Sequence, residues 1–405
     1  MQSRKKITKK SKIITRRYFD YAAATPVDPL VQKKMQTYDA WLFHNAGTIY
    51  KEGVLAEQAL EDARARMATM LHAMPEEVIF TSGGTESDNL ALYGILRAYQ
   101  GKKKPHMIFS AIEHSAVYEW AVRMVERKEI EVTYLPVDTE GQVDLKILKE
   151  SIRPETVLIS IQYVNSETGT IQPVKDISRI MRKYRKEHES VYPYFHTDAA
   201  QAPLYIPIHL DTLGVDLLSL NGSKIYGPHL GSLVVRRGVL FEPLFYGGTQ
   251  EHGRRAGTVH VSAVLGFVEA LSLADSRREK DALRLGKQRA SLVDKLAQFR
   301  HVHLLGNSDT TTPAHVFISV DQYPSELLVL ELDARGIAVS SQSACTVGGG
   351  EISRVHTAVM QGADHTAGTI RITIGRMTTS SDIQALIQAL KDIFKKYTEW
   401  YGNTK

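Results

Sequence analysis

The feature that most constrains the fold of this chain is a regular alternation of short apolar runs with segments of helical periodicity. From Val78 onward, a helical segment follows each of four runs, "VIFTSG", "HMIFSAIEH", "IEVTYLPV" and "TVLISIQYV". Three more predicted strands come next, in "YPYFHTDAA", "VDLLSLNGSK" and "SLVVRR". Strands that are apolar throughout and alternate with helices predict a mainly parallel sheet flanked by helices, which is an α/β fold.

The pattern changes after about Ser262, which predicts a second domain. A charged helical stretch covers residues 277–300, and the apolar runs "HVFISV" and "TIRITIGR" follow, with helices between and after them. We therefore predict a large domain over residues 34–279. A smaller α+β domain would combine residues 18–33 with residues 280–405.

Basic residues concentrate in residues 1–17, which carry eight Lys or Arg and no acid. The whole chain has 50 Lys and Arg against 45 Asp and Glu, a net charge of +5. Without those 17 residues, 42 basic residues face 45 acidic ones, a net charge of −3. We predict a flexible basic extension. An arm that binds nucleic acid is the alternative, but no nucleic-acid-binding motif occurs elsewhere, so a nucleic-acid partner is not expected.

The sequence also bears on location and on metal binding. No apolar run approaches the roughly 18 residues that a membrane span needs. The start lacks the apolar segment of a signal peptide, so we expect a cytoplasmic protein without membrane contact. Cys345 is the single cysteine. One cysteine excludes an intramolecular disulfide framework and a Cys-rich zinc site, and we expect no metal.

Polar residues follow the predicted strands, at the edge where α/β sheets bind ligands. The turn "TSGGTESDN" places Gly84 and Thr85 at the start of a helix, where backbone N–H groups and the helix dipole favour a phosphate. Asp198 ends one strand and Lys224 ends the next. Taken singly, these are equally a capping turn and an ion pair. Together they offer the lysine, the acid and the phosphate site that pyridoxal phosphate requires.

Three further residues suit such a site. His114, in "IEHSAV", has a flat ring that could lie on the cofactor and move protons. Arg371 is a charge within an apolar strand and needs a carboxylate partner, which an amino-acid substrate would provide in bidentate form. Cys345 lies in the polar, glycine-rich stretch "SSQSACTVGGG". It is either a reactive thiolate or a loop cysteine without a function.

Nine motifs resemble, in order and spacing, those of the cysteine desulfurases, which belong to the class V branch of the fold-type-I pyridoxal-phosphate enzymes. They are "YFDYAAATPVDP", "VIFTSGGTESDNLAL", "EHSAV", "VNSETGTIQP", "HTDAAQ", "SKIYGP", "GRRAGT", "SSQSACT" and "IRITIGR", from about Tyr18 to about Met377. The resemblance implies a homodimeric enzyme that converts L-cysteine to L-alanine and keeps the sulfur on a cysteine as a persulfide. A sulfur-acceptor protein, in iron–sulfur cluster assembly or tRNA thiolation, would then receive it.

The resemblance also implies catalytic roles. Lys224 would form a Schiff base with pyridoxal phosphate and then act as the base at the α-carbon of the substrate. Cys345 would attack the substrate sulfur. His114 would stack on the cofactor ring and carry protons. Asp198 would pair with the ring nitrogen and Gln201 with the ring oxygen.

Binding residues follow from the same resemblance. The phosphate would be held by Gly84, Thr85, Ser223 and Thr258, the last reaching over from the other subunit. The substrate carboxylate would be held by Asn165, also part of the cofactor site, and by Arg371. This chain departs from the usual pattern before the lysine, where Asn221 and Ser223 replace a serine and a histidine. We expect both residues in the cofactor site, with a binding mode altered in detail.

Three other functions share parts of this pattern. A selenocysteine lyase or a class V aminotransferase would use the same cofactor chemistry, but transamination does not need Cys345. A non-catalytic assembly subunit would be free to lose Lys224, Asp198 and His114, all of which are present. The pattern as a whole favours the desulfurase.

Overall fold

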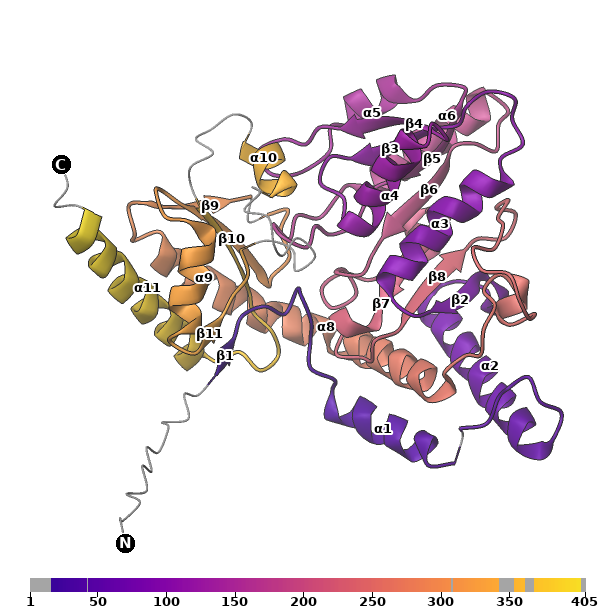
Figure 1. Ribbon diagram of the computed structural model, residues 1–405, viewed down its shortest axis with the longest axis horizontal. Helices are drawn as coiled ribbons and strands as arrows, with labels where there is room; N and C mark the ends of the chain where they lie inside the picture. Colours follow the sequence, from indigo (N-terminus) through magenta and orange to yellow (C-terminus); the bar gives the residue numbers. More distant parts are fainter. Residues whose placement is uncertain (1–15, 42, 307–308, 342–352, 361–367, 402–405) are drawn as a thin grey trace, which may run out of the picture.

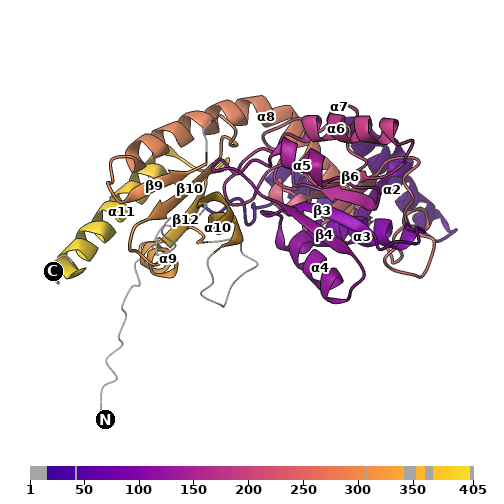
Figure 2. The same cartoon turned by 90° about the horizontal axis from the view of Figure 1, so that it is seen from above.

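The computed structural model describes residues 16–41, 43–306, 309–341, 353–360 and 368–401. These residues form two lobes, here called the large lobe and the small lobe, and helix α8 (Val261–Leu296) runs from one to the other (Figures 1 and 2). Cys345 and most of the predicted basic extension lie outside the described residues. No helix among the described residues combines the length and the apolar character needed to cross a membrane.

A seven-stranded sheet forms the centre of the large lobe, in the order β2-β8-β7-β6-β5-β3-β4. Its strands are β2 (Val78–Thr81), β3 (His106–Ser110), β4 (Glu131–Leu135), β5 (Thr156–Ser160), β6 (Tyr194–Asp198), β7 (Leu217–Asn221) and β8 (Gly231–Val235). Strand β8 pairs antiparallel with β2 and β7, and the other pairings are parallel. The mainly parallel sheet confirms the predicted α/β fold.

Helices cover both faces of this sheet because successive strand residues point to opposite sides. On strand β3, Ile108 belongs to one buried cluster, and its neighbours Met107 and Phe109 belong to the other. Two helices pack on the Met107 face, α3 (Gly84–Ala98) and α4 (Ser115–Glu126). The Ile108 face carries α2 (Lys51–Leu71), α5 (Leu145–Ser151), α6 (Val174–Glu187), α7 (Leu210–Leu213) and the first part of α8.

The small lobe is built on a three-stranded antiparallel sheet in the order β12-β10-β9. Its strands are β9 (Val302–Leu305), β10 (His315–Val320) and β12 (Gly368–Thr373), and the parallel pair β1 (Arg17–Tyr18) and β11 (Ile337–Ala338) lies with them. Its helices are α9 (Ser325–Asp333), α10 (Arg354–Met360) and α11 (Ser380–Tyr401). Helix α10 also reaches the large lobe, because Val355 and Val359 join the core cluster of that lobe.

The boundary between the lobes falls inside one continuous helix. Residues up to Ala274 of α8 pack in the large lobe, and residues from Leu285 onward pack in the small lobe. The sequence predicted a charged helix only from residue 277, whereas α8 begins at Val261. The first half of α8 is apolar and buried, and only its second half, nearer solvent, shows the charged pattern. Helix α1 (Pro29–Asp39) packs on the large lobe through Val31, whereas the predicted division assigned residues 18–33 to the small domain.

Candidate active site

One cavity lies where the carboxyl ends of β6 and β7 meet the loops that follow β2, β3 and β5. Eight residues predicted from the sequence line it, namely Gly84, Thr85, His114, Asp198, Gln201, Asn221, Lys224 and Arg371. Arg371 comes from β12 of the small lobe and the other seven come from the large lobe. The cavity therefore lies between the two lobes, and only the folded chain brings these residues together.

Lys224 projects into this cavity from a single 3₁₀ turn, η2 (Gly222–Lys224), which follows β7 directly. The turn needs a glycine at position 222, because a Cβ there would lie 2.5 Å from the carbonyl oxygen of Pro228. The Nζ of Lys224 donates to the carbonyl oxygen of Ala23, in the segment that links β1 to α1. The amine is thus half-buried and fixed in direction, as a lysine that reacts with a bound carbonyl group must be.

The first turn of α3 and Asn221 form the end of the cavity that suits an anion. The Oδ1 of Asn221 accepts hydrogen bonds from the N–H (3.1 Å) and the hydroxyl (2.9 Å) of Ser223. Its Nδ2 consequently faces α3, where a Cβ on Gly84 would lie 3.2 Å from it. Backbone N–H groups at a helix start and an amide donor together make a phosphate site. Ser223 was expected to donate to the phosphate, but its hydroxyl donates to Asn221.

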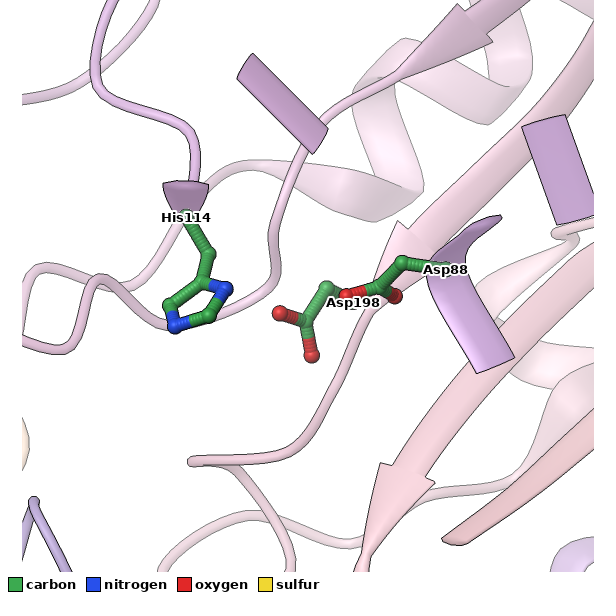
Figure 3. A group of neighbouring side chains, drawn as sticks. All are labelled: Asp88, His114 and Asp198. Atoms are coloured by element: carbon green, nitrogen blue, oxygen red, sulfur yellow. The ribbon is translucent and has the colours of Figure 1, made fainter. Parts of the chain in front are cut away.

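Figure 3 shows His114, Asp88 and Asp198, whose side chains gather at one place in the cavity from α4, α3 and β6. One polar atom of each lies within 4.8 Å of the others. Burial, and next the charge of Asp198, raise the pKa of Asp88 well above its usual range. The raised pKa favours the protonated form of Asp88 beside Asp198, and a carboxyl pair of this kind suits a protonated ring nitrogen.

Asp88 was not predicted as a site residue, because the predicted residues were polar groups at strand ends and Asp88 lies within a helix. The available signal was its spacing from Thr85, because residues three apart on a helix share one face. Glu113 was also missed as a site residue. It is 2% exposed, accepts hydrogen bonds from the Gln162 N–H and the Ser110 hydroxyl, and burial raises its pKa to about 8.

A buried histidine supports β6 behind the cavity. The Nδ1 of His196 lies 2.8 Å from the Ser160 hydroxyl and its Nε2 lies 2.9 Å from the Ser219 hydroxyl. Burial lowers the pKa of His196 to about 3, so the ring is neutral and one nitrogen donates while the other accepts. This neutral ring ties three neighbouring strands together beside the acids without adding a charge.

Arg371 is 1% exposed and already has the carboxylate partner that its burial demands. Its Nη2 donates to Asp20 at 2.6 Å and its Nη1 donates to the carbonyl oxygen of Ser166 at 3.0 Å. Its Nε is buried without a hydrogen-bond partner among the described residues. These two contacts use two of the five guanidinium N–H groups, so the carboxylate partner that the sequence called for is supplied by Asp20 of this chain.

Asn165, predicted to hold the cofactor and the substrate carboxylate, points away from the cavity. Its Nδ2 donates to the carbonyl oxygen of Ile112 at 3.1 Å. Its Oδ1 accepts from the backbone N–H groups of Glu167 and Thr168, both at 2.8 Å. The side chain thus closes the turn after β5, in the manner of asparagine in loops.

Two more predicted residues are not among the described residues that line this cavity. Thr258 is exposed and lines a separate hollow with Asp39, Phe43 and His44. That position agrees with a role in the site of another subunit, and this role stays a prediction. Cys345 lies outside the described residues.

The donor set as a whole fits pyridoxal phosphate. It contains a directed lysine, two neighbouring carboxyl groups, an imidazole ring and an N–H-rich helix start, all around one cavity. The same three polar groups, Asp88, His114 and Asp198, have the number and spacing of a metal site. The adjacent Lys224 and the anion-binding turn are explained by the cofactor and not by a metal.

Comparison with known proteins agrees with this chemistry. The family model described as Aminotransferase class-V matches residues 17–386. A cysteine desulfurase IscS of Dictyoglomus turgidum is 38% identical, with 96% of this chain and 98% of the relative aligned. A solved structure of a NifS-like protein superimposes with a TM-score of 0.86 at 32% identity over 94% of this chain and 100% of its own. A structure titled SspA in complex with cysteine has a TM-score of 0.75 at 32% identity, over 88% and 98%.

Proposed function

We propose a sulfur-transfer reaction at this site for a chain that belongs to the aminotransferase class-V family and, within it, to the cysteine desulfurases. The protein is a pyridoxal-phosphate-dependent enzyme of that family. The observation that carries the assignment of residues is the meeting of Lys224, Asp198 and the first turn of α3 in one cavity.

Each residue has one task toward the cofactor. Lys224 would bind it covalently, Asp198 would keep a proton on its ring nitrogen, and Gln201 would face its ring oxygen. Backbone N–H groups at Gly84 and Thr85 would hold its phosphate. The bound cofactor supplies an electron sink for the α-carbon of an amino-acid substrate.

The chain's own residues then move the protons and the sulfur. The Nζ of Lys224 would take the proton from the α-carbon of the substrate and later return one to it. The Sγ of Cys345, as a thiolate, would attack the sulfur of L-cysteine. The new S–S bond would form as the substrate C–S bond breaks, the electron pair of that bond would stay with the carbon part, and one proton at the β-carbon and one at the α-carbon would then give L-alanine. His114, which lines the same cavity, would pass on the proton at the β-carbon. L-cysteine and the thiol thus yield L-alanine and a persulfide, so no other oxidant or reductant is needed.

We also propose that the enzyme works as a homodimer. Phe43, which lines the hollow that contains Thr258, is 76% exposed, and Ile49 (99%) and Tyr50 (51%) shortly after it in the chain are exposed too, which is costly for a monomer. A second copy would cover them and receive Thr258. A sulfur-acceptor protein would take the sulfur from Cys345. We expect the enzyme in the cytoplasm, where a reducing environment keeps the thiol free.

The test is a paired assay of wild type, Cys345→Ala and Lys224→Ala with added pyridoxal phosphate. Wild type is expected to show the visible absorbance of the bound cofactor and to form L-alanine from L-cysteine, with sulfide released once a thiol reductant is present. Cys345→Ala should keep the absorbance and lose sulfide formation. Lys224→Ala should lose both the normal absorbance and turnover. A Cys345→Ala variant as active as wild type would leave a lyase or an aminotransferase as the function.

A further inference from the structure

The two described residues that flank the segment with Cys345 are Ser341 and Ser353, and both are tied to the substrate side of the cavity. At the first end, Ser340 pairs with Arg371 on β12. The Arg371 N–H donates to the Ser340 carbonyl at 2.7 Å and the Ser340 N–H donates back at 3.3 Å. The Thr369 hydroxyl donates to the carbonyl oxygen of Ser341 at 3.2 Å.

At the second end, the hydroxyl of Ser353 donates to the Oε2 of Glu167 at 2.6 Å. Both side chains are buried, with exposed fractions of 7% and 5%. A buried hydrogen bond to a carboxylate is stronger than one between neutral groups. The same Ser353 oxygen accepts from the N–H of Val355 at 3.1 Å and so begins helix α10.

Helix α10 has a second attachment near the cavity. The guanidinium of Arg354 lies 3.4 Å from the centre of the Tyr118 ring. Tyr118 is on α4, the helix that begins next to His114. This cation–π contact and the Glu167 hydrogen bond hold the start of α10 to helix α4 and to the turn after β5 of the large lobe.

Arg371 connects the two ends. Its Nη1 donates to the carbonyl oxygen of Ser166, so the same residue that pairs with Ser340 also holds the turn that receives Ser353. The side chain of Asn165 makes this turn rigid, with its Oδ1 accepting from the N–H of Glu167 at 2.8 Å. Arg371, the predicted substrate-carboxylate residue, therefore shares one network with both ends of the segment that contains the thiol.

We propose that Glu167 and Ser353 are positioning residues for sulfur transfer: their hydrogen bond fixes the second end of the Cys345 segment relative to Arg371. This inference rests on the proposed role of Cys345. A thiol must meet the substrate sulfur within van der Waals reach, and small errors of position are costly for such a step. Losing the contact should slow persulfide formation without weakening the cofactor site, which neither side chain lines.

The experiment compares Glu167→Ala, Ser353→Ala and the double variant, each loaded with cofactor. In a single turnover with L-cysteine, each single variant should form the Cys345 persulfide about tenfold more slowly than wild type. The double variant should be no slower than the slower single one, because both lose the same hydrogen bond. Cofactor absorbance and its change on adding L-cysteine should keep the wild-type amplitude.

Two controls separate positioning from folding. Ser353→Thr retains the hydroxyl and should stay within about threefold of wild type. Asp144→Ala removes the N-cap of α5, a helix as short as α10 whose cap side chain accepts only from the N–H groups of Lys146 and Ile147 among the hydrogen bonds of the described residues, and should leave the persulfide rate unchanged. Because Cys345 is the single cysteine, its alkylation by iodoacetamide gives a readout without turnover. That rate should rise in Glu167→Ala and Ser353→Ala and stay constant in both controls.

Several results would overturn the inference. Persulfide or alkylation rates equal to wild type in the single variants would do so. A double variant whose loss of persulfide rate equals the product of the two single losses would also overturn it. A loss of persulfide formation that is fully explained by a loss of bound cofactor would overturn it as well. A wild type that forms alanine but no persulfide would instead contradict the proposed role of Cys345, and the inference would fall with it.

Discussion

At the scale of single residues, a hydrogen bond links the side chains of Asn221 and Ser223, the two predicted cofactor residues just before Lys224. The Ser223 hydroxyl donates to the Oδ1 of Asn221, and this hydrogen bond orients the amide nitrogen of Asn221 toward Gly84. Asn221 is thereby the side chain closest to the helix start, and Ser223 acts through it.

We therefore predict that Asn221→Ala weakens binding of pyridoxal phosphate to the apoprotein more than Ser223→Ala does. Loss of a donor to a charged phosphate should raise the Kd about tenfold or more, and loss of an orienting neutral hydrogen bond about threefold. Absorbance titration of the apoprotein measures both. A larger effect from Ser223→Ala would mean that serine contacts the phosphate itself.

Glu113 predicts a dependence of stability on pH. Its pKa is 4.5 in the unfolded chain and about 8 in the fold because of burial. Between these values the folded state holds the proton more tightly, so the free energy of unfolding falls as the pH rises through that window. Glu113→Gln removes this loss, and its stability relative to wild type should rise between pH 5 and pH 8, by on the order of 4 kcal/mol.

Urea unfolding across that pH range measures the difference. The control is Glu52→Gln, an exposed glutamate on α2, whose stability relative to wild type should stay constant. A difference for Glu113→Gln that stays flat with pH would mean that Glu113 is ionised in the fold.

At the scale of elements, a buried ion pair fixes the turn that leads to Thr258. Glu251, in the 3₁₀ turn η3 (Glu251–Gly253), receives two hydrogen bonds of 2.7 Å from Arg64 on α2. It also accepts from the N–H of Phe80 on β2 at 2.7 Å. One carboxylate thus joins a helix, a strand and a turn in a place where water does not compete.

Glu251→Gln should destabilise the fold by about 3–5 kcal/mol, because Arg64 is left buried without its counter-charge. The matched control is Glu61→Gln, since Glu61 pairs with the same arginine at 3.1 Å but its side chain is 46% exposed. That variant should cost about 1 kcal/mol or less. Chemical unfolding compares the two, and equal costs would show that burial is not the reason.

At the scale of the whole molecule, the proposed dimer makes each active site depend on two chains. Lys224→Ala and Thr258→Val should each be nearly inactive alone. Mixed after unfolding and refolding together, they should recover about a quarter of wild-type activity, because half the dimers are mixed and one of their two sites is intact. No recovery, with dimers seen in sedimentation, would place Thr258 in the site of its own chain.

Patterns local in sequence were enough to predict the framework of this protein. Apolar runs predicted each strand of the large sheet, and seven of the eight predicted residues that line the cavity lie at or after the ends of those strands, because strand ends in an α/β sheet meet at one edge; Arg371, on β12, is the exception. The resemblance to cysteine desulfurases, and with it the cofactor, was confirmed by the family model and the relatives. Roles of single residues stay predictions.

Other features depend on contacts between distant segments, which no local pattern contains. Arg371 pairs with Asp20, 351 positions away, and Ser353 with Glu167, 186 positions away. The raised pKa of Asp88 follows from its burial and, next, from the charge of Asp198. The sequence by itself thus determined which chemical groups stand at the ends of the strands. Only the tertiary structure decided how they pair and ionise, because pairing and desolvation exist only once the lobes have packed together.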